Sequence, residues 1–75
     1  MRHAADIAVE KARTSGVAWV GARMSNHAGP ASLYTRYVLE KGMIGIYVAV
    51  GSANHMPPWG GTDMLLSTNP ISVAI

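Results

Sequence analysis

The distribution of charge is the sequence feature that most limits what this chain can fold into. Nine of its ten charged residues lie within the first 41 positions, and Asp63 is the one charged residue from Gly42 to Ile75. A domain that folds alone exposes much of its surface to water, and a long uncharged stretch makes a poor solvated surface. We therefore predict that residues 42–75 are covered by further protein and that residues 1–75 form a single partial domain. A small domain that oligomerises through this half is the alternative.

The composition excludes several classes of protein. Hydrophobic residues make up 49% and charged residues 13% of the chain, whereas intrinsic disorder requires high charge and low hydrophobicity. The six basic residues are scattered and the formal net charge is only +2, so we expect no nucleic-acid partner. The longest apolar run, residues 43–50, is much shorter than the roughly 20 residues of a membrane span. Cysteine is absent and charges interrupt the first 15 residues, so we expect a cytoplasmic protein without a secretory signal.

Hydrophobic periodicity predicts an α/β chain with the order helix–strand–helix–strand–loop–strand. The predicted elements are a helix over 3–14, a strand over 17–23, a helix over 30–41, a strand over 43–50, a loop over 51–63 and a strand over 70–75. Gly16 stands where a glycine commonly ends a helix, and Pro30 suits a first helical position. The first two strands are apolar on both faces, which is typical of buried parallel strands joined by a right-handed crossover. The tryptophans and tyrosines are predicted to lie in the core.

The loops that follow the first two predicted strands form the expected ligand site. Parallel strands joined in this way end at the same edge of the sheet, where α/β proteins bind their ligands. Each loop contains an asparagine–histidine pair, Asn26-His27 in one and Asn54-His55 in the other. No constraint of the fold requires both pairs, so the repetition favours a shared function at this edge.

His27 is the leading candidate for a catalytic residue. An imidazole gives or takes a proton near neutral pH, and the neighbouring Ser25 and Asn26 could set its tautomer or bind a substrate oxygen. In the alternative, Ser25 and Asn26 cap the following helix and His27 is merely exposed. His55 precedes a proline-rich turn and is more simply explained as a structural or surface histidine, and its role stays open.

The remaining polar groups give weaker signals. Thr68 and Asn69 either belong to the site or form a plain turn into the last strand, because asparagine before proline favours turns. We expect no metal site, because the three histidines show no ligand spacing and cysteine is absent. The glycine-rich fingerprints of phosphate loops and of Rossmann dinucleotide domains are also absent.

Three motifs follow one another along the chain. They are Gly16-Val17-Ala18-Trp19-Val20-Gly21-Ala22-Arg23 with Ser25-Asn26-His27-Ala28-Gly29, then Pro58-Trp59-Gly60-Gly61, then Ser67-Thr68-Asn69-Pro70-Ile71. Their order and spacing resemble the malate/L-lactate dehydrogenase family of NAD(P)-dependent oxidoreductases, which is unrelated to the Rossmann-fold lactate dehydrogenases. The resemblance extends over essentially the whole chain.

The resemblance implies that the chain is a fragment of a much longer homodimeric enzyme. Members of the family interconvert 2-hydroxy acids and 2-keto acids such as malate, lactate, sulfolactate, ureidoglycolate and diketogulonate, with NAD or NADP as the cofactor. His27 matches their active-site histidine, the proton donor or acceptor at the substrate oxygen. Ser25, Asn26, Thr68 and Asn69 match positions close to substrate or cofactor.

Two departures from the family pattern leave the substrate open. Many members have phenylalanine where Ala28 stands, which would widen the space beside His27, and the loop at 53–56 lacks an acidic residue that orients the substrate in some members. The leading hypothesis is part of a malate- or lactate-like dehydrogenase that works by hydride transfer and is inactive as an isolated fragment. The alternative is a non-catalytic interaction module that binds a partner through the uncharged face of residues 42–75.

Overall fold

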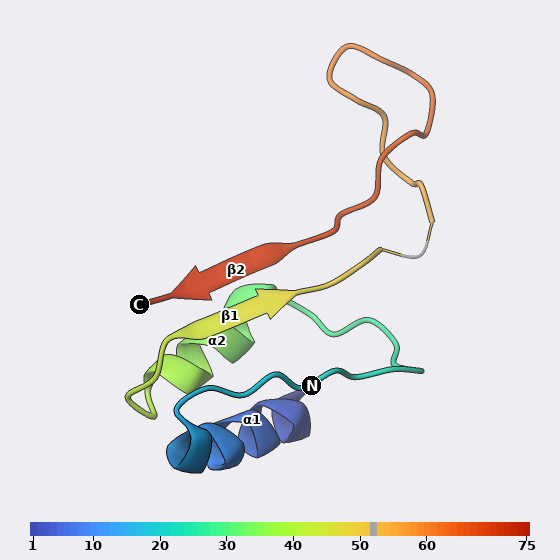
Figure 1. Cartoon of the computed structure of the whole chain (residues 1–75). Coiled ribbons are helices and arrows are strands. Elements are labelled where there is room, and N and C mark those ends of the chain that lie inside the picture. The colour runs from blue at the N-terminus through green and yellow to red at the C-terminus, as the bar shows by residue number, and fades with distance from the viewer. Residues whose placement is uncertain (52) are drawn as a thin grey trace.

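The computed structural model describes residues 1–51 and 53–75. Its elements are α1 over Arg2–Ser15, α2 over Ala31–Leu39, β1 over Gly45–Val48 and β2 over Ile71–Ala74. The two strands form an antiparallel sheet, α2 packs on one face of this sheet, and α1 contacts α2 (Figure 1). The prediction of an α/β chain is confirmed. No helix in the described ranges combines the length and the apolar character that a membrane span needs.

The helix α2 packs against the sheet through small and polar groups. A Cβ atom on Gly45 would lie 2.8 Å from the backbone oxygen of Thr35, so the helix approaches β1 where glycine has no side chain. Thr35 is 2% exposed, and its hydroxyl forms a hydrogen bond of 2.9 Å with the hydroxyl of Ser72 on β2. The rings of Tyr34 and Tyr47 stack with 5.5 Å between their centroids. Together these contacts hold α2 across both strands.

The helix α1 ends as predicted and is joined to α2 at Tyr37. Gly16 has a φ of 83°, in the left-handed region that favours glycine, and its N–H donates to the Ala12 carbonyl at 2.8 Å. The Tyr37 hydroxyl donates to Asp6 Oδ1 at 2.5 Å, and the Arg2 guanidinium lies 3.7 Å from the centroid of the same ring. The predicted helix over 3–14 is confirmed to within one residue at each end.

The remaining predicted elements agree with the structure at their centres. The predicted helix over 30–41 contains α2, but Pro30 precedes the helix with a φ of −64° and a ψ of 127°, so its assignment as the first helical residue is wrong by one position. The predicted strands over 43–50 and 70–75 contain β1 and β2. Both strands are shorter than predicted because pairing covers only Gly45–Val48 and Ile71–Ala74.

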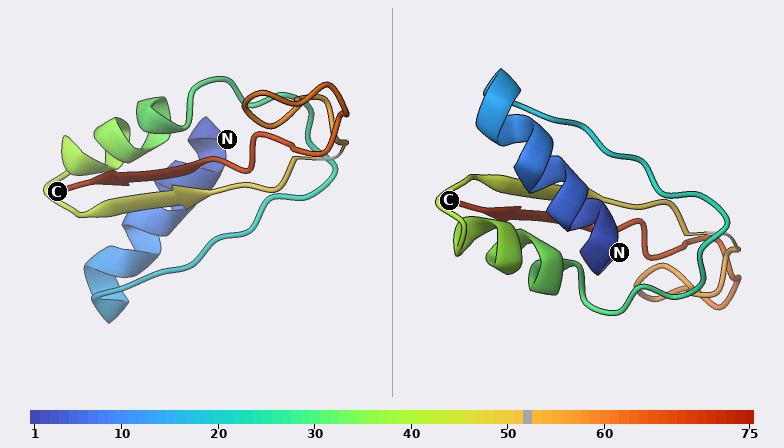
Figure 2. Two further views of the ribbon diagram at one scale, coloured as in Figure 1. Left: turned by 90° about the horizontal axis from the view of Figure 1, so that it is seen from above. Right: turned by 90° about the horizontal axis from the view of Figure 1, so that it is seen from below.

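The predicted strand over 17–23 and its parallel pair are wrong. Residues 17–23 belong to no strand, and they run as an extended segment from the end of α1 towards the loop before α2 (Figure 2). Val17 and Trp19 are each 79% exposed, and Trp59 is also fully exposed, so neither tryptophan lies in a core. An apolar pattern on both faces is compatible with a strand but does not select its partner, and here β1 pairs with β2 instead.

The segment between the strands returns the chain to β1. Met56 and Leu66 form an isolated antiparallel bridge, and the main chains at these two residues exchange hydrogen bonds of 2.9 and 3.1 Å. Figure 1 shows this loop projecting away from the sheet. The loop predicted over 51–63 is therefore partly paired with the residues after it, and this pairing guides β2 into an antiparallel position.

The chain exposes an unusually large surface for its size. Its accessible area is 6021 Å², whereas a compact monomer of 7.9 kDa exposes about 4400 Å². The radius of gyration is 14.7 Å, against about 11 Å for a compact domain of this length. Much of the excess is apolar, because Ile46, Val48, Ile71 and Val73 share the sheet face opposite α2 and are all exposed.

Candidate functional site

An open cavity of about 960 Å³ is lined by α1, the extended segment after it, α2 and β1. Its walls are formed mainly by alanine, valine and glycine residues. This volume falls within the range of sites that bind small molecules, roughly 300–1,000 Å³. Both loops that carry an asparagine–histidine pair contribute residues to this one cavity.

His27, Ser25 and Asn26 line the cavity together from the loop before α2. All three side chains are exposed, so the imidazole is accessible to a molecule in the cavity. The N-terminus of α2 follows Pro30 and receives no hydrogen bond from a capping side chain. The capping of this helix by Ser25 and Asn26 in the alternative is therefore wrong, whereas His27 is exposed, as that alternative also predicted.

His55 and Thr68 line the same cavity from the segment between the strands. The Nδ1 atom of His55 lies 2.8 Å from the carbonyl oxygen of Ala53. Because a carbonyl oxygen only accepts, Nδ1 carries the proton of this bond, and Nε2 of the neutral ring is left as an acceptor. The two histidine loops thus border one cavity, although the parallel strand pair from which a shared ligand site was predicted does not form.

Asn69 holds the wall of the cavity and is not part of its lining. Its side-chain oxygen Oδ1 accepts a hydrogen bond of 2.7 Å from the N–H of Gly51, a residue that does line the cavity. The φ of Asn69 is 33°, and asparagine tolerates such positive values better than most residues. The side chain therefore ties the segment that follows β1 to the segment that precedes β2.

The ionisable side chains of the cavity are two histidines and two tyrosines. They are His27, His55, Tyr34 and Tyr47, and the described lining contains no aspartate, glutamate, lysine or arginine. Within residues 1–51 and 53–75 no group of three or more His, Cys, Asp or Glu side chains could hold a metal ion. Imidazole, hydroxyl and amide groups can bind the oxygen atoms of a small polar molecule, and an imidazole can move a proton.

Tyr34 and Tyr47, which the sequence predicts only as core residues, also line this site. Tyr34 donates a hydrogen bond from its hydroxyl to the carbonyl of Ala28, the residue that follows His27. The closeness of Tyr34 to the histidine loop along the chain could have indicated this contact, because Tyr34 lies in the first turn of the helix that follows the loop. Its ring is also stacked on Tyr47, so it links this loop to the sheet.

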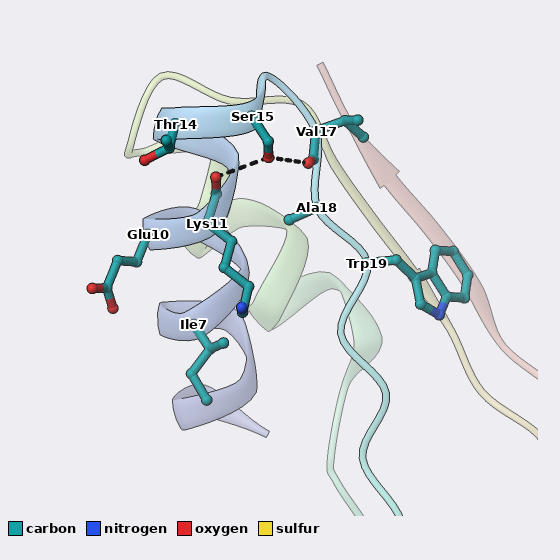
Figure 3. A pocket seen from close by; sticks show the side chains of 8 residues that line it. All are labelled: Ile7, Glu10, Lys11, Thr14, Ser15, Val17, Ala18 and Trp19. Carbon is teal, nitrogen blue, oxygen red and sulfur yellow. Dashed lines mark hydrogen bonds between the residues drawn. The ribbon is translucent and has the colours of Figure 1, made fainter.

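A second, smaller cavity of about 550 Å³ lies at the C-terminal end of α1. Figure 3 shows its lining, in which Glu10 and Thr14 project from the outside of the helix. The Ser15 hydroxyl donates hydrogen bonds to the carbonyl oxygens of Lys11 and Val17, at 2.9 and 2.6 Å. This cavity contains none of the predicted site residues, and it is a groove along the helix surface.

Comparison with known proteins gives consistent matches. Residues 1–75 match the family described as malate/L-lactate dehydrogenase. The chain is 44% identical over 68 residues to malate dehydrogenase of Pyrococcus abyssi, covering 91% of this chain and 18% of that protein. It is 37% identical over 73 residues to L-sulfolactate dehydrogenase of Methanocaldococcus jannaschii, covering 97% of this chain and 21% of that protein.

A reductase is also similar to this chain. The 2,3-diketo-L-gulonate reductase of Escherichia coli is 40% identical over 70 residues, which cover 93% of this chain and 21% of the reductase. The chain thus spans about a fifth of the length of the curated relatives it matches. No solved structure matches the chain at a significant level.

Proposed function

The chain belongs to the malate/L-lactate dehydrogenase family, and from this premise we propose that it forms part of an oxidoreductase that interconverts a small 2-hydroxy acid and the corresponding 2-keto acid. The names of its relatives support this substrate class, because malate and sulfolactate are hydroxy acids and diketogulonate is a keto acid. Which acid the protein uses is left open, because these three relatives differ in their substrates while they are similarly close to this chain.

The observation that carries the proposal is the position of His27. Its imidazole is exposed in a cavity whose described lining contains no aspartate, glutamate, lysine or arginine. In oxidation, His27 accepts the proton of the substrate hydroxyl as the carbon–oxygen bond becomes a carbonyl, and in reduction it returns that proton to the oxygen. Ser25 and Asn26 stand beside it and bind polar atoms of the same acid, and Thr68 contributes a hydroxyl from the opposite segment.

A nicotinamide cofactor, NAD or NADP, supplies the hydride chemistry when it is bound. The described lining of the cavity holds no lysine or arginine, the side chains that most often neutralise phosphates in proteins. The described lining therefore offers no permanently cationic side chain to the diphosphate of a dinucleotide or to the carboxylate of the acid, and we assign no cofactor contact to its residues. We propose that the complete protein is as long as its relatives and that other parts of it bind the diphosphate. We also propose that it acts as a homodimer in the cytoplasm.

The test is the substitution His27→Ala in the complete protein. General acid–base help is typically worth 10²–10⁴ in rate, so we expect kcat for a 2-hydroxy acid to fall by at least about a hundredfold. His3→Ala is the matched control, because His3 is an exposed histidine of α1 outside the cavity lining. Turnover of the His27 variant within about tenfold of the parent would remove the proposed role.

One observation favours a second candidate function, a non-catalytic interaction module. The exposed side chains of Ile46, Val48, Ile71 and Val73 form an apolar face on the sheet that a protein partner could cover. Melting of the complete protein with and without NADH or NADPH separates the two functions. A cofactor that binds the folded state raises the melting temperature, whereas an interaction module leaves it unchanged.

A further inference from the structure

We propose that Tyr34 is a positioning residue for His27 and sets the orientation of its imidazole in the cavity. This inference rests on the proposed function, because it concerns the residue that we assign to proton transfer. The hydroxyl of Tyr34 donates a hydrogen bond to the carbonyl of Ala28, the residue directly after His27. Both Tyr34 and Ala28 line the same cavity as His27.

Tyr34 is itself firmly held. Its ring stacks on Tyr47 of β1, with 5.5 Å between the centroids and an angle of 22° between the planes. The next residue, Thr35, is buried and is bonded to Ser72 of β2. The phenol therefore extends from a residue that is stacked on β1 and lies next to the buried Thr35, which makes it a suitable point of attachment for the loop.

The histidine loop has little else to hold it. Residues 23–27 are exposed, and Gly29 follows with a φ of 80°. Pro30 comes next and has no N–H that could donate a main-chain hydrogen bond. Among the side-chain hydrogen bonds of the described residues, the one from Tyr34 is the bond that reaches residues 24–30. The orientation of the peptide between Ala28 and Gly29, which ends the histidine loop, therefore depends on this contact.

The chemistry predicts a specific kinetic consequence. Without the hydroxyl, the loop samples more orientations, and fewer molecules hold the imidazole in line with the substrate hydroxyl. Binding of the acid is less affected, because the Tyr34 proton is directed to Ala28 and not into the cavity. Loss of one hydrogen bond corresponds to roughly a three- to tenfold fall in kcat, with the KM for the acid changed by less than about twofold.

The test compares Tyr34→Phe with Tyr37→Phe in the complete protein. The two substitutions remove the same hydroxyl from the same helix, but Tyr37 bonds to Asp6 in α1 and lies outside the cavity lining. The ring proton and nitrogen resonances of His27 are recorded by NMR, and kcat and KM are measured for a 2-hydroxy acid. We expect Tyr34→Phe to shift the His27 resonances and lower kcat, and Tyr37→Phe to leave both close to those of the parent.

A rescue experiment at position 34 and the NMR spectra of His27 together test whether the hydrogen bond from Tyr34 orients His27. 4-Aminophenylalanine at position 34 replaces the hydroxyl with an N–H donor, and we expect it to restore the His27 spectrum and most of kcat. If Tyr34→Phe moves the resonances and kcat no more than Tyr37→Phe does, Tyr34 is not a positioning residue. If the parent turns over no hydroxy acid, the proposed function fails, and the spectra alone still decide whether Tyr34 orients His27.

Discussion

The two apolar segments that flank α2, residues 17–23 and β1, are similar in sequence and very different in structure. Both are short runs of small and branched apolar residues that predict a buried strand. The segment β1 pairs with β2 and packs on α2, whereas Val17 and Trp19 of the first segment remain exposed. An apolar run thus becomes a strand only where another segment supplies hydrogen bonds, and the strand is buried only on the face that packs on a helix.

The same contrast holds for the two faces of the sheet. The face towards α2 holds Gly45 and Ser72, which allow close approach and a hydrogen bond to the helix. The opposite face holds branched apolar side chains such as Ile46 and Val73, and all of them are exposed. We infer that the exposed face and the unpaired segment 17–23 are the parts of this chain that need further protein.

The largest effect is expected when a charge is placed on the exposed sheet face. Val73→Lys in the complete protein should lower the free energy of unfolding by about 3 kcal/mol or more, because a covered lysine has no partner for its charge. Denaturant unfolding measures the change. Ser32→Lys on the exposed surface of α2 is the control and should cost less than about 0.5 kcal/mol. Equal effects for the two variants would show that the face is not covered.

A smaller effect is expected at the contact between α2 and β1. Gly45→Ala places a Cβ atom 2.8 Å from the backbone oxygen of Thr35, so the helix must move and the free energy of unfolding should fall by about 1–3 kcal/mol. Gly21→Ala is the matched control, because its added Cβ meets nothing within 4 Å. Thermal unfolding of both variants checks the difference, and a tolerated Gly45→Ala would contradict the close packing of α2 on β1.

The smallest effect is expected from the hydrogen bond that joins α2 to β2. Thr35→Val keeps the shape of the side chain but removes its bond to Ser72, so the free energy of unfolding should fall by about 1 kcal/mol. Thr62→Val changes an exposed threonine in the same way and should have almost no effect. Chemical denaturation distinguishes them, and indistinguishable midpoints would mean that the hydroxyl pair contributes nothing to stability.

The candidate site was only partly predictable from the sequence. The polar loop around His27 and the second loop around His55 were found from their residue types, and both line one cavity. Asn69 was predicted close to substrate or cofactor, and in the structure its side chain supports Gly51 at the cavity wall. The contact from Tyr34 to Ala28 was missed because a tyrosine on an apolar helix face is most simply interpreted as a core residue.

The sequence by itself determined the local elements and the family. The glycine that ends α1, the proline before α2 and the apolar runs of β1 and β2 act over a few neighbouring residues, so their effects can be predicted from the chain alone. Only the tertiary structure decided which segment pairs with β1 and which face of the sheet receives α2. Strand pairing is a competition between distant segments of similar hydrophobicity, and here the loop bridged at Met56 and Leu66 brings β2 back to β1, which leaves residues 17–23 unpaired.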